Sequence, residues 1–186
     1  MARGTIRRFS DGLVQLVAPL DYSAPSVPAV AAGTSTFRLY NDDKRTQITS
    51  DAVAGATVIS ISDAALFDVG DAIAIRLDDT TTIHSTTVVS KSSVNRNMSI
   101  ANAIPAGRTA KAGAWVQVYL GSSSAIAMTS YGTPATARDN WGYVGVIPDT
   151  LELFNVNKVG IETEFIQSVT GNRLFKRRTE MVVEED

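Results

Sequence analysis

Residues 55–77 read GATVISISDAALFDVGDAIAIRL, and this stretch decides the fold class. Every second residue of TVISIS is apolar, and the same period of two returns in AIAIRL, as expected for half-buried strands. Between them, residues 64–67 fit a tight turn and Gly70-Asp71 opens the second strand. The stretch predicts two short strands whose inward positions are Ile59 and Ile61, then Ile73, Ile75 and Leu77.

Alternation of the same kind continues on both sides of this stretch. STFRLY, residues 35–40, predicts a strand ended by the polar turn Asn41-Asp42-Asp43. Downstream, residues 82–90 alternate, Met98 and Ile100 come after a turn at residues 92–97, and AWVQVYL closes the set near residue 120. Five short strands between about residues 56 and 120 predict a small barrel- or sandwich-like module, which we assign to residues 35–120.

Three further regions complete the predicted organisation of a mainly β protein. Residues 1–34, with Pro25 and Pro28, predict an extended N-terminal arm or linker. Residues 121–139 predict an uncharged loop, part of a charge-free stretch from 112 to 137 that suits either a surface loop or contact with another chain. Residues 140–186 predict a second β region with a C-terminal hairpin at 158–183, where Glu162 and Glu164 face the basic run 176–178 across the strands.

Composition limits the classes of function open to the chain. Its 186 residues include no Cys and one His, which excludes disulfide scaffolds, thiolate metal sites and multi-His centres. Thr, Ser and Val together favour β structure. The net charge of −2 gives no reason to expect nucleic acid as a partner. No apolar run is long enough for a membrane helix or a signal peptide, so we expect cytoplasmic synthesis and no membrane partner.

The search for catalytic, cofactor and metal residues predicts none. His84 lies in mid-strand without a second ligand or a nucleophile at a useful spacing. The pairs Asp42-Asp43 and Asp78-Asp79 fall at expected turns, where Asp bonds to backbone, and they lack the spacing of a calcium loop. Five aromatics could form a glycan-stacking platform, although core and interface packing is the simpler interpretation: Trp115, Tyr119, Tyr131, Trp141 and Tyr143.

Subunit contact is the remaining role for the arm and the uncharged segment. An arm of extended backbone orders by packing on a neighbour, and an uncharged segment is well suited to burial against protein. We therefore predict contact residues in both regions: Arg3, Arg7, Arg8, Leu13, Leu16, Ala125, Ile126, Met128, Tyr131 and Trp141.

Two segments resemble a β module found in virion proteins of tailed bacteriophages. Residues 55–75 match its Ala-Gly-Ala-Thr-x-Ile opening, its Ala-x-x-Phe turn and its Gly-Asp-x-Ile strand start, and AIPAGRTAKAGAWV, residues 103–116, is similar to its end. STFRLYNDD also resembles short openings in neck and collar proteins. The likeness covers about residues 35–120 and carries over no catalytic residue.

The resemblance implies a non-enzymatic structural component of a phage particle, located in the virion and assembled in the host cytoplasm. The most specific expectation is a multi-copy collar or neck protein at the head–tail junction, a homo-oligomer that also binds portal, connector, capsid or fibre proteins. The alternatives are a capsid decoration or fibre-anchoring protein, or a β-sandwich glycan-binding module. A hydrolase would need paired carboxylates in a cleft, which sequence cannot place.

Overall fold

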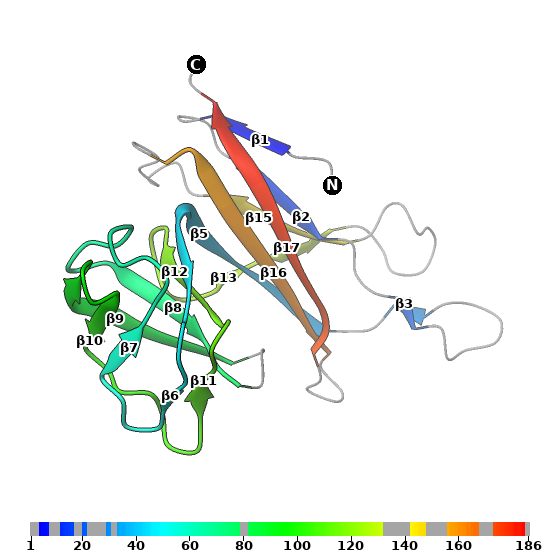
Figure 1. Ribbon diagram of the computed structural model, residues 1–186. Coiled ribbons are helices and arrows are strands. Elements are labelled where there is room, and N and C mark those ends of the chain that lie inside the picture. The colour runs from blue at the N-terminus through cyan, green and yellow to red at the C-terminus, as the bar shows by residue number, and fades with distance from the viewer. Residues whose placement is uncertain are drawn as a thin grey trace. The chain divides into compact units, whose positions relative to one another are not determined.

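The computed structural model is all-β and describes most of the chain as strands and turns (Figure 1). The prediction of a mainly β fold is confirmed, and the described residues include no helix. The chain forms two compact units, Met1–Leu39 with Ser124–Asp186 (unit 1) and Tyr40–Ser123 (unit 2). The described residues are 4–7, 12–16, 20–21, 29–30, 33–78, 82–131, 142–147, 156–167 and 173–184.

Unit 2 is built from residues that are contiguous in sequence. Its main sheet contains, in order, the second half of β5, then β12, β8, β9, β10 and β7, and β6 pairs with β11. The bounds are β5 Gly33–Gln47, β6 Ala52–Val53, β7 Val58–Ser60, β8 Ala72–Arg76, β9 Ile83–Ser92, β10 Asn97–Ile100, β11 Thr109–Ala110 and β12 Trp115–Tyr119.

The two edges of this sheet approach each other without forming a closed barrel. An isolated bridge joins Ile48, just after β5, to Ile61, just after β7. Two flanking hydrogen bonds extend the contact, from Thr49 N to Ser60 O at 2.9 Å and from Ser62 N to Gln47 O at 2.8 Å. A strongly curled sheet therefore surrounds one core, and a single bridge, rather than a full ladder, links its first and last strands.

The inward positions predicted from alternation form the core of unit 2. Ile59, Ile61, Ile73, Ile75 and Leu77 are each at most 2% exposed. Phe67, from the turn between β7 and β8, is fully buried among them. Burying such side chains contributes about 1.5–3 kcal/mol each, so this cluster supplies most of the driving force for folding the unit. Met98, Ile100, Val116 and Val118 complete the predicted set.

The predicted turn at Asn41-Asp42-Asp43 is wrong, because β5 continues through it. In the ladder with β12, Val118 faces Asn41 and Gln117 faces Arg45, so residues 42–44 bulge out between two paired segments. The Asn41 side chain accepts a hydrogen bond from Asp43 N at 3.0 Å, the local bond that makes Asn and Asp frequent in turns. Here that bond stabilises a bulge instead, and the strand then resumes.

Unit 1 combines segments from distant parts of the sequence. The first half of β5 lies in one sheet with β16, β17 and β1, and β13 pairs with β5; β14, β15 and β2 form a second sheet, and β3 pairs with β4. The bounds are β1 Gly4–Arg7, β2 Gly12–Leu16, β3 Leu20–Asp21, β4 Ala29–Val30, β13 Ile126–Ala127, β14 Thr129–Tyr131, β15 Gly142–Ile147, β16 Lys158–Gln167 and β17 Arg173–Glu184.

The C-terminal hairpin is confirmed, with β16 antiparallel to β17 over nine residue pairs from Lys158↔Val182 to Ile166↔Arg173. The segments assigned to an arm and an uncharged loop contain the strands β1–β4, β13 and β14. The boundaries of unit 2, residues 40–123, nearly match those of the module predicted at 35–120. The regions before and after this module were predicted as separate parts but belong to one unit.

Two glycines of unit 1 lie where a side chain would clash, Gly145 between two sheets and Gly33 beside the neighbouring strand of its own sheet. A Cβ on Gly145, in β15, would lie 2.5 Å from Phe37 Cε1, and one on Gly33 would lie 2.3 Å from Ile166 O. Tyr143, two residues before Gly145, packs against Phe165 of β16 with ring centroids 5.6 Å apart. The β15 strand therefore packs directly on β5 and β16, which makes unit 1 a sandwich at this point.

Candidate functional site

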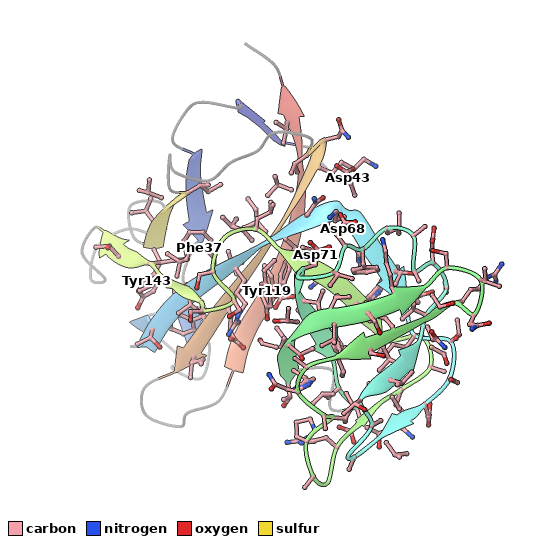
Figure 2. All side chains as sticks on the ribbon, turned by 90° about the vertical axis from the view of Figure 1, so that its left-hand side faces the viewer. Phe37, Asp43, Asp68, Asp71, Tyr119 and Tyr143 are labelled. Carbon is pink, nitrogen blue, oxygen red and sulfur yellow. The ribbon has the colours of Figure 1, made fainter. Side chains whose placement is uncertain are left out.

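The densest group of charged side chains in unit 2 surrounds the turn Phe67–Asp71. Lys44 Nζ lies 2.7 Å from Asp68 Oδ2 and 3.1 Å from Asp71 Oδ2. Lys91 from β9 adds a contact of 3.4 Å to Asp68 Oδ1 and donates to the carbonyl of Phe67. Figure 2 shows Asp68 and Asp71 side by side on this turn. Two lysines thus neutralise two aspartates, and we call these four side chains the charge clamp.

The backbone of the turn is fixed by the same residues. Asp71 Oδ2 accepts a hydrogen bond from Asp68 N at 2.8 Å, and Asp71 N donates to Asp68 O at 3.1 Å. Gly70 N donates to Val88 O at 2.9 Å, which attaches the turn to β9. Gly70 has φ +97°, a conformation that a side chain would strain. The Gly-Asp pair seen in the sequence is therefore a structural unit in which each residue has a separate task.

The bulge in β5 positions Lys44 for the charge clamp. Bulges redirect the side chains that they carry, and Lys44 is the last bulged residue before the ladder resumes at Arg45. Sequence reasoning noticed the polar triplet Asn41-Asp42-Asp43 and the Phe67–Asp71 turn separately but missed Lys44, which connects them. No sequence pattern pairs Lys44 with residues 24 and 27 positions away, because the sheet alone brings them together.

Within the charge clamp, the pKa values of Lys44 and Asp68 shift in opposite directions. Hydrogen bonding to Lys44 holds the pKa of Asp68 below its ordinary value. Partial burial lowers the pKa of Lys44, but the hydrogen bonds to Asp68 and Asp71 outweigh it and raise that pKa overall. Both shifts favour the charged forms of Lys44 and Asp68, so this ion pair is stable at neutral pH. Such a group holds a turn; it supplies neither a free base nor a free acid.

The other candidate groups for catalysis or metal binding also make structural contacts. His84 is 8% exposed, and its Nε2 lies 2.9 Å from Asn102 O, which ties β9 to the loop after β10. Asp78 lies 3.7 Å from Arg108 Nη1, and Asp79 falls outside the described residues. Within the described ranges no three His, Asp or Glu side chains gather as a metal site, nor is any helix long and apolar enough to cross a membrane.

Three of the five aromatics proposed as a glycan platform are described, and packing engages their rings. The Arg45 guanidinium lies 3.6 Å from the centroid of Trp115. Tyr119 stacks on Tyr40 at 5.2 Å between centroids, and its hydroxyl lies 2.8 Å from Ser85 Oγ. Tyr143 donates to Gly33 O at 2.8 Å. The geometry favours packing over sugar stacking for these rings; the Tyr131 side chain and Trp141 lie outside the described part.

The predicted contact residues occupy several strands of unit 1. Leu13 and Leu16 lie in β2, in register with Val146 and Tyr143 of β15. Ile126 faces Phe37 across the β13–β5 ladder. Arg7 and Tyr131 end β1 and β14, and Ala125 and Ile126 are half-buried. Arg3, Arg8 and Trp141 fall outside the described residues.

Met128, another of these residues, packs within its own unit. It is 7% exposed, and Ser35 Oγ lies 3.2 Å from its sulfur and equally far from Glu164 O. Sequence reasoning missed Ser35, together with Gly33 and Gly145, because small residues in strands show their purpose only when the facing layer is known.

A charge ladder runs along β16 and its neighbours in unit 1. Glu164 is 6% exposed, and its Oε2 lies 3.9 Å from Arg38 Nη1 of β5. On the other side, Glu164 is in register with Lys176 and Glu162 with Arg178 of β17. The predicted pairing of acidic β16 with basic β17 thus agrees with the ladder at two positions, and Arg177 lies opposite Thr163.

The edges of the two sheets of unit 1 are formed by short strands. β1 ends the sheet that contains β17, while β2 and β14 flank β15. An edge strand presents backbone N–H and C=O groups that another chain can pair with. In comparisons with protein-family models, curated proteins and solved structures, no match to this chain was found.

Proposed function

We propose that this chain is a non-enzymatic structural component of a tailed-phage particle, a multi-copy collar or neck protein at the head–tail junction. The observation that carries the proposal is the build of the turn Phe67–Asp71, which the charge clamp holds. The residues that give the sequence its resemblance to a virion module, Phe67, Gly70 and Asp71, bury a ring, form a positive-φ turn and cap a backbone amide. Each of these roles stabilises the fold and none involves chemistry on a substrate, which fits a structural protein.

The remaining chemistry of the described residues supports the same conclusion. His84 and the acids at residues 51, 68, 71 and 78 make hydrogen bonds or ion pairs to neighbours in the same unit. A general base or nucleophile needs a substrate-facing position as well as a tuned pKa. Side chains committed to turns and loops do not have that freedom.

Edge strands supply the surfaces for assembly. β1, β2 and β14 each lie at the edge of a sheet of unit 1, and β1 and β2 come from the segment predicted to contact neighbours. The partners we propose are further copies of the chain and other virion proteins such as portal, connector, capsid or fibre, and neither nucleic acid nor membrane. The site of action is then the virion, after assembly in the host cytoplasm.

Immunogold electron microscopy of the phage particles, with an antibody against the purified chain, tests the proposal. Label at the head–tail junction is expected. Label over the capsid or the fibres would replace the neck by a decoration or fibre-anchoring role. Absence of the chain from purified particles by mass spectrometry would overturn the structural role as a whole. A variant that lacks residues 1–33 is expected to incorporate poorly, since it loses β1 and β2.

A further inference from the structure

The pairing of β1 with β17 is unlike a hairpin because no local turn sets it. β1 runs parallel to β17, with Gly4 opposite Met181 and Arg7 opposite Glu184. Almost the whole chain lies between the paired residues, so local connectivity contributes nothing to the register. The same backbone hydrogen bonds would form if a β1 from another copy lay along the same edge.

Charge favours this pairing whichever copy supplies the strand. Residues 3–8 hold Arg3, Arg7 and Arg8 and no acid, while residues 184–186 are Glu-Glu-Asp. The parallel register brings the basic end of β1 to the acidic end of β17, where Arg7 is opposite Glu184. Opposite charges at this register favour it over a shifted or reversed alignment.

The connection to β2 limits where β1 can reach. β2 is held by five residue pairs to β15, from Gly12↔Ile147 to Leu16↔Tyr143. Only residues 8–11 separate β1 from β2, and an extended chain spans at most about 3.6 Å per residue, or roughly 18 Å over these five steps. A neighbour can therefore receive β1 only if its β17 edge lies within that distance of the donor's β2.

From these observations we infer that β1 is an exchangeable strand, which pairs in the assembled state with β17 of a second copy of this chain. The inference rests on the proposed multi-copy role and names the contact that builds the oligomer. Donor edge and acceptor edge are different surfaces, so each copy gives one strand and receives one. Repetition of such a heterologous contact closes into a ring when the rotation permits.

Disulfide trapping tests the exchange directly, because the chain has no native cysteine. Ile6 and Val183 are opposite in the ladder, and neighbouring strands lie about 4.8 Å apart, within the range that a disulfide bridges. Ile6→Cys and Val183→Cys are made as separate full-length variants, mixed under denaturing conditions, refolded together and oxidised. Strand exchange places the two different cysteines side by side, so it raises the yield of the mixed disulfide between the two variants above the collision level.

Two further cysteine mixtures serve as controls for random collision and for misfolding of a variant. Ile6→Cys mixed with Val94→Cys, whose residue is 93% exposed in unit 2, measures random collision. The pair Thr5→Cys and Val182→Cys repeats the test at the adjacent register position in case one variant folds poorly. Dimer from both β1–β17 mixtures, several-fold above the collision control, supports exchange.

Light scattering on the wild-type chain separates the two proposals. An oligomer that gives no β1–β17 cross-link in either mixture overturns strand exchange while the structural role stands. A monomer that gives no cross-link also overturns exchange, and the absence of the chain from particles is the result that would overturn the structural role. A Gly4→Pro variant is expected to weaken the oligomer, because proline removes a backbone donor from the donated strand.

Discussion

The two units pack their β-sheets in different ways. Unit 2 encloses one continuous apolar core with a curled sheet from a single segment, residues 40–123, and the charge clamp holds its main turn. Unit 1 brings together segments from both sides of unit 2 and achieves close contact by omitting side chains at Gly33 and Gly145. Locally connected strands fold through neighbours in sequence, whereas unit 1 must close long loops first.

The contrast bears on our proposal that the assembly contacts belong to unit 1. In unit 2 short connections join β8 to β9 and β9 to β10, and these connections set the register locally. A unit that already pairs a distant strand, as β17 pairs with β1, can accept the same strand from another copy at little extra cost. Substitutions that disturb the packing of one unit at a time test this difference between the units.

Phe67→Ala is expected to give the largest effect, a loss of about 3–5 kcal/mol in the free energy of unfolding of unit 2. The ring is fully buried at the centre of the core, and the turn that carries it cannot collapse into the cavity while the charge clamp holds. Urea denaturation followed by the fluorescence of Trp115, in a Trp141→Phe background, measures unit 2. Val94→Ala, at an exposed turn position, should change the midpoint very little.

Gly145→Ala is expected to destabilise unit 1 by about 1–3 kcal/mol, since its new methyl group would overlap the Phe37 ring. The matched control is Val146→Ala, the next residue on the same strand and 48% exposed, which should lie near the wild type. The double variant Gly145→Ala with Phe37→Leu should recover part of the loss. Equal destabilisation of the control and Gly145→Ala would contradict close packing as the cause.

Lys44→Met is expected to lower Tm by a few degrees, an effect that depends on pH. Asp68 has its pKa lowered by Lys44, so its contribution is present above its ordinary value of 3.8 and is lost as pH falls through the lower folded value. Lys44 has its pKa raised, so its contribution is present below 10.5 and is lost as pH rises through the higher folded value. The Tm difference between variant and wild type should therefore shrink at both extremes.

Lys111→Met serves as the comparison for Lys44→Met. Lys111 forms a single exposed pair with Asp51 at 2.8 Å, and exposed pairs contribute little. Its effect on Tm should be smaller than that of Lys44→Met at neutral pH, and both should weaken in high salt. A Lys44→Met effect that is the same at every pH would mean that side-chain packing, and not the ion pairs, holds the turn.

Much of unit 2 could be predicted from the sequence, and much less of unit 1. Alternation placed Ile73, Ile75 and Leu77 on one inward face because side chains alternate along a strand with a period of two. The same rule failed at Asn41-Asp42-Asp43, since a bulge and a turn use the same side-chain-to-backbone bond and differ only in whether the strand resumes after it. In unit 1 the C-terminal hairpin was predicted, but not the strands that pair with distant partners.

For the candidate contact residues too, the sequence identified the residue types and the tertiary structure decided their neighbours. The sequence identified Met128 and Ile126 as candidate contact residues, and the tertiary structure buries Met128 within unit 1 and leaves Ile126 half-buried opposite Phe37. It identified Arg7 as a basic residue in an extended segment, and the β1–β17 register decided that Glu184 is its neighbour.

By itself, the sequence determined the all-β class, the inward faces of the central strands and the absence of thiol or multi-His chemistry, because these depend on composition and short-range period. The tertiary structure decided that Lys44 meets Asp68 and Asp71, that Gly145 admits the Phe37 ring, and that β1 lies along β17. These contacts join residues far apart in sequence. Their formation depends on loop closure and on complementary layers, which no local pattern records.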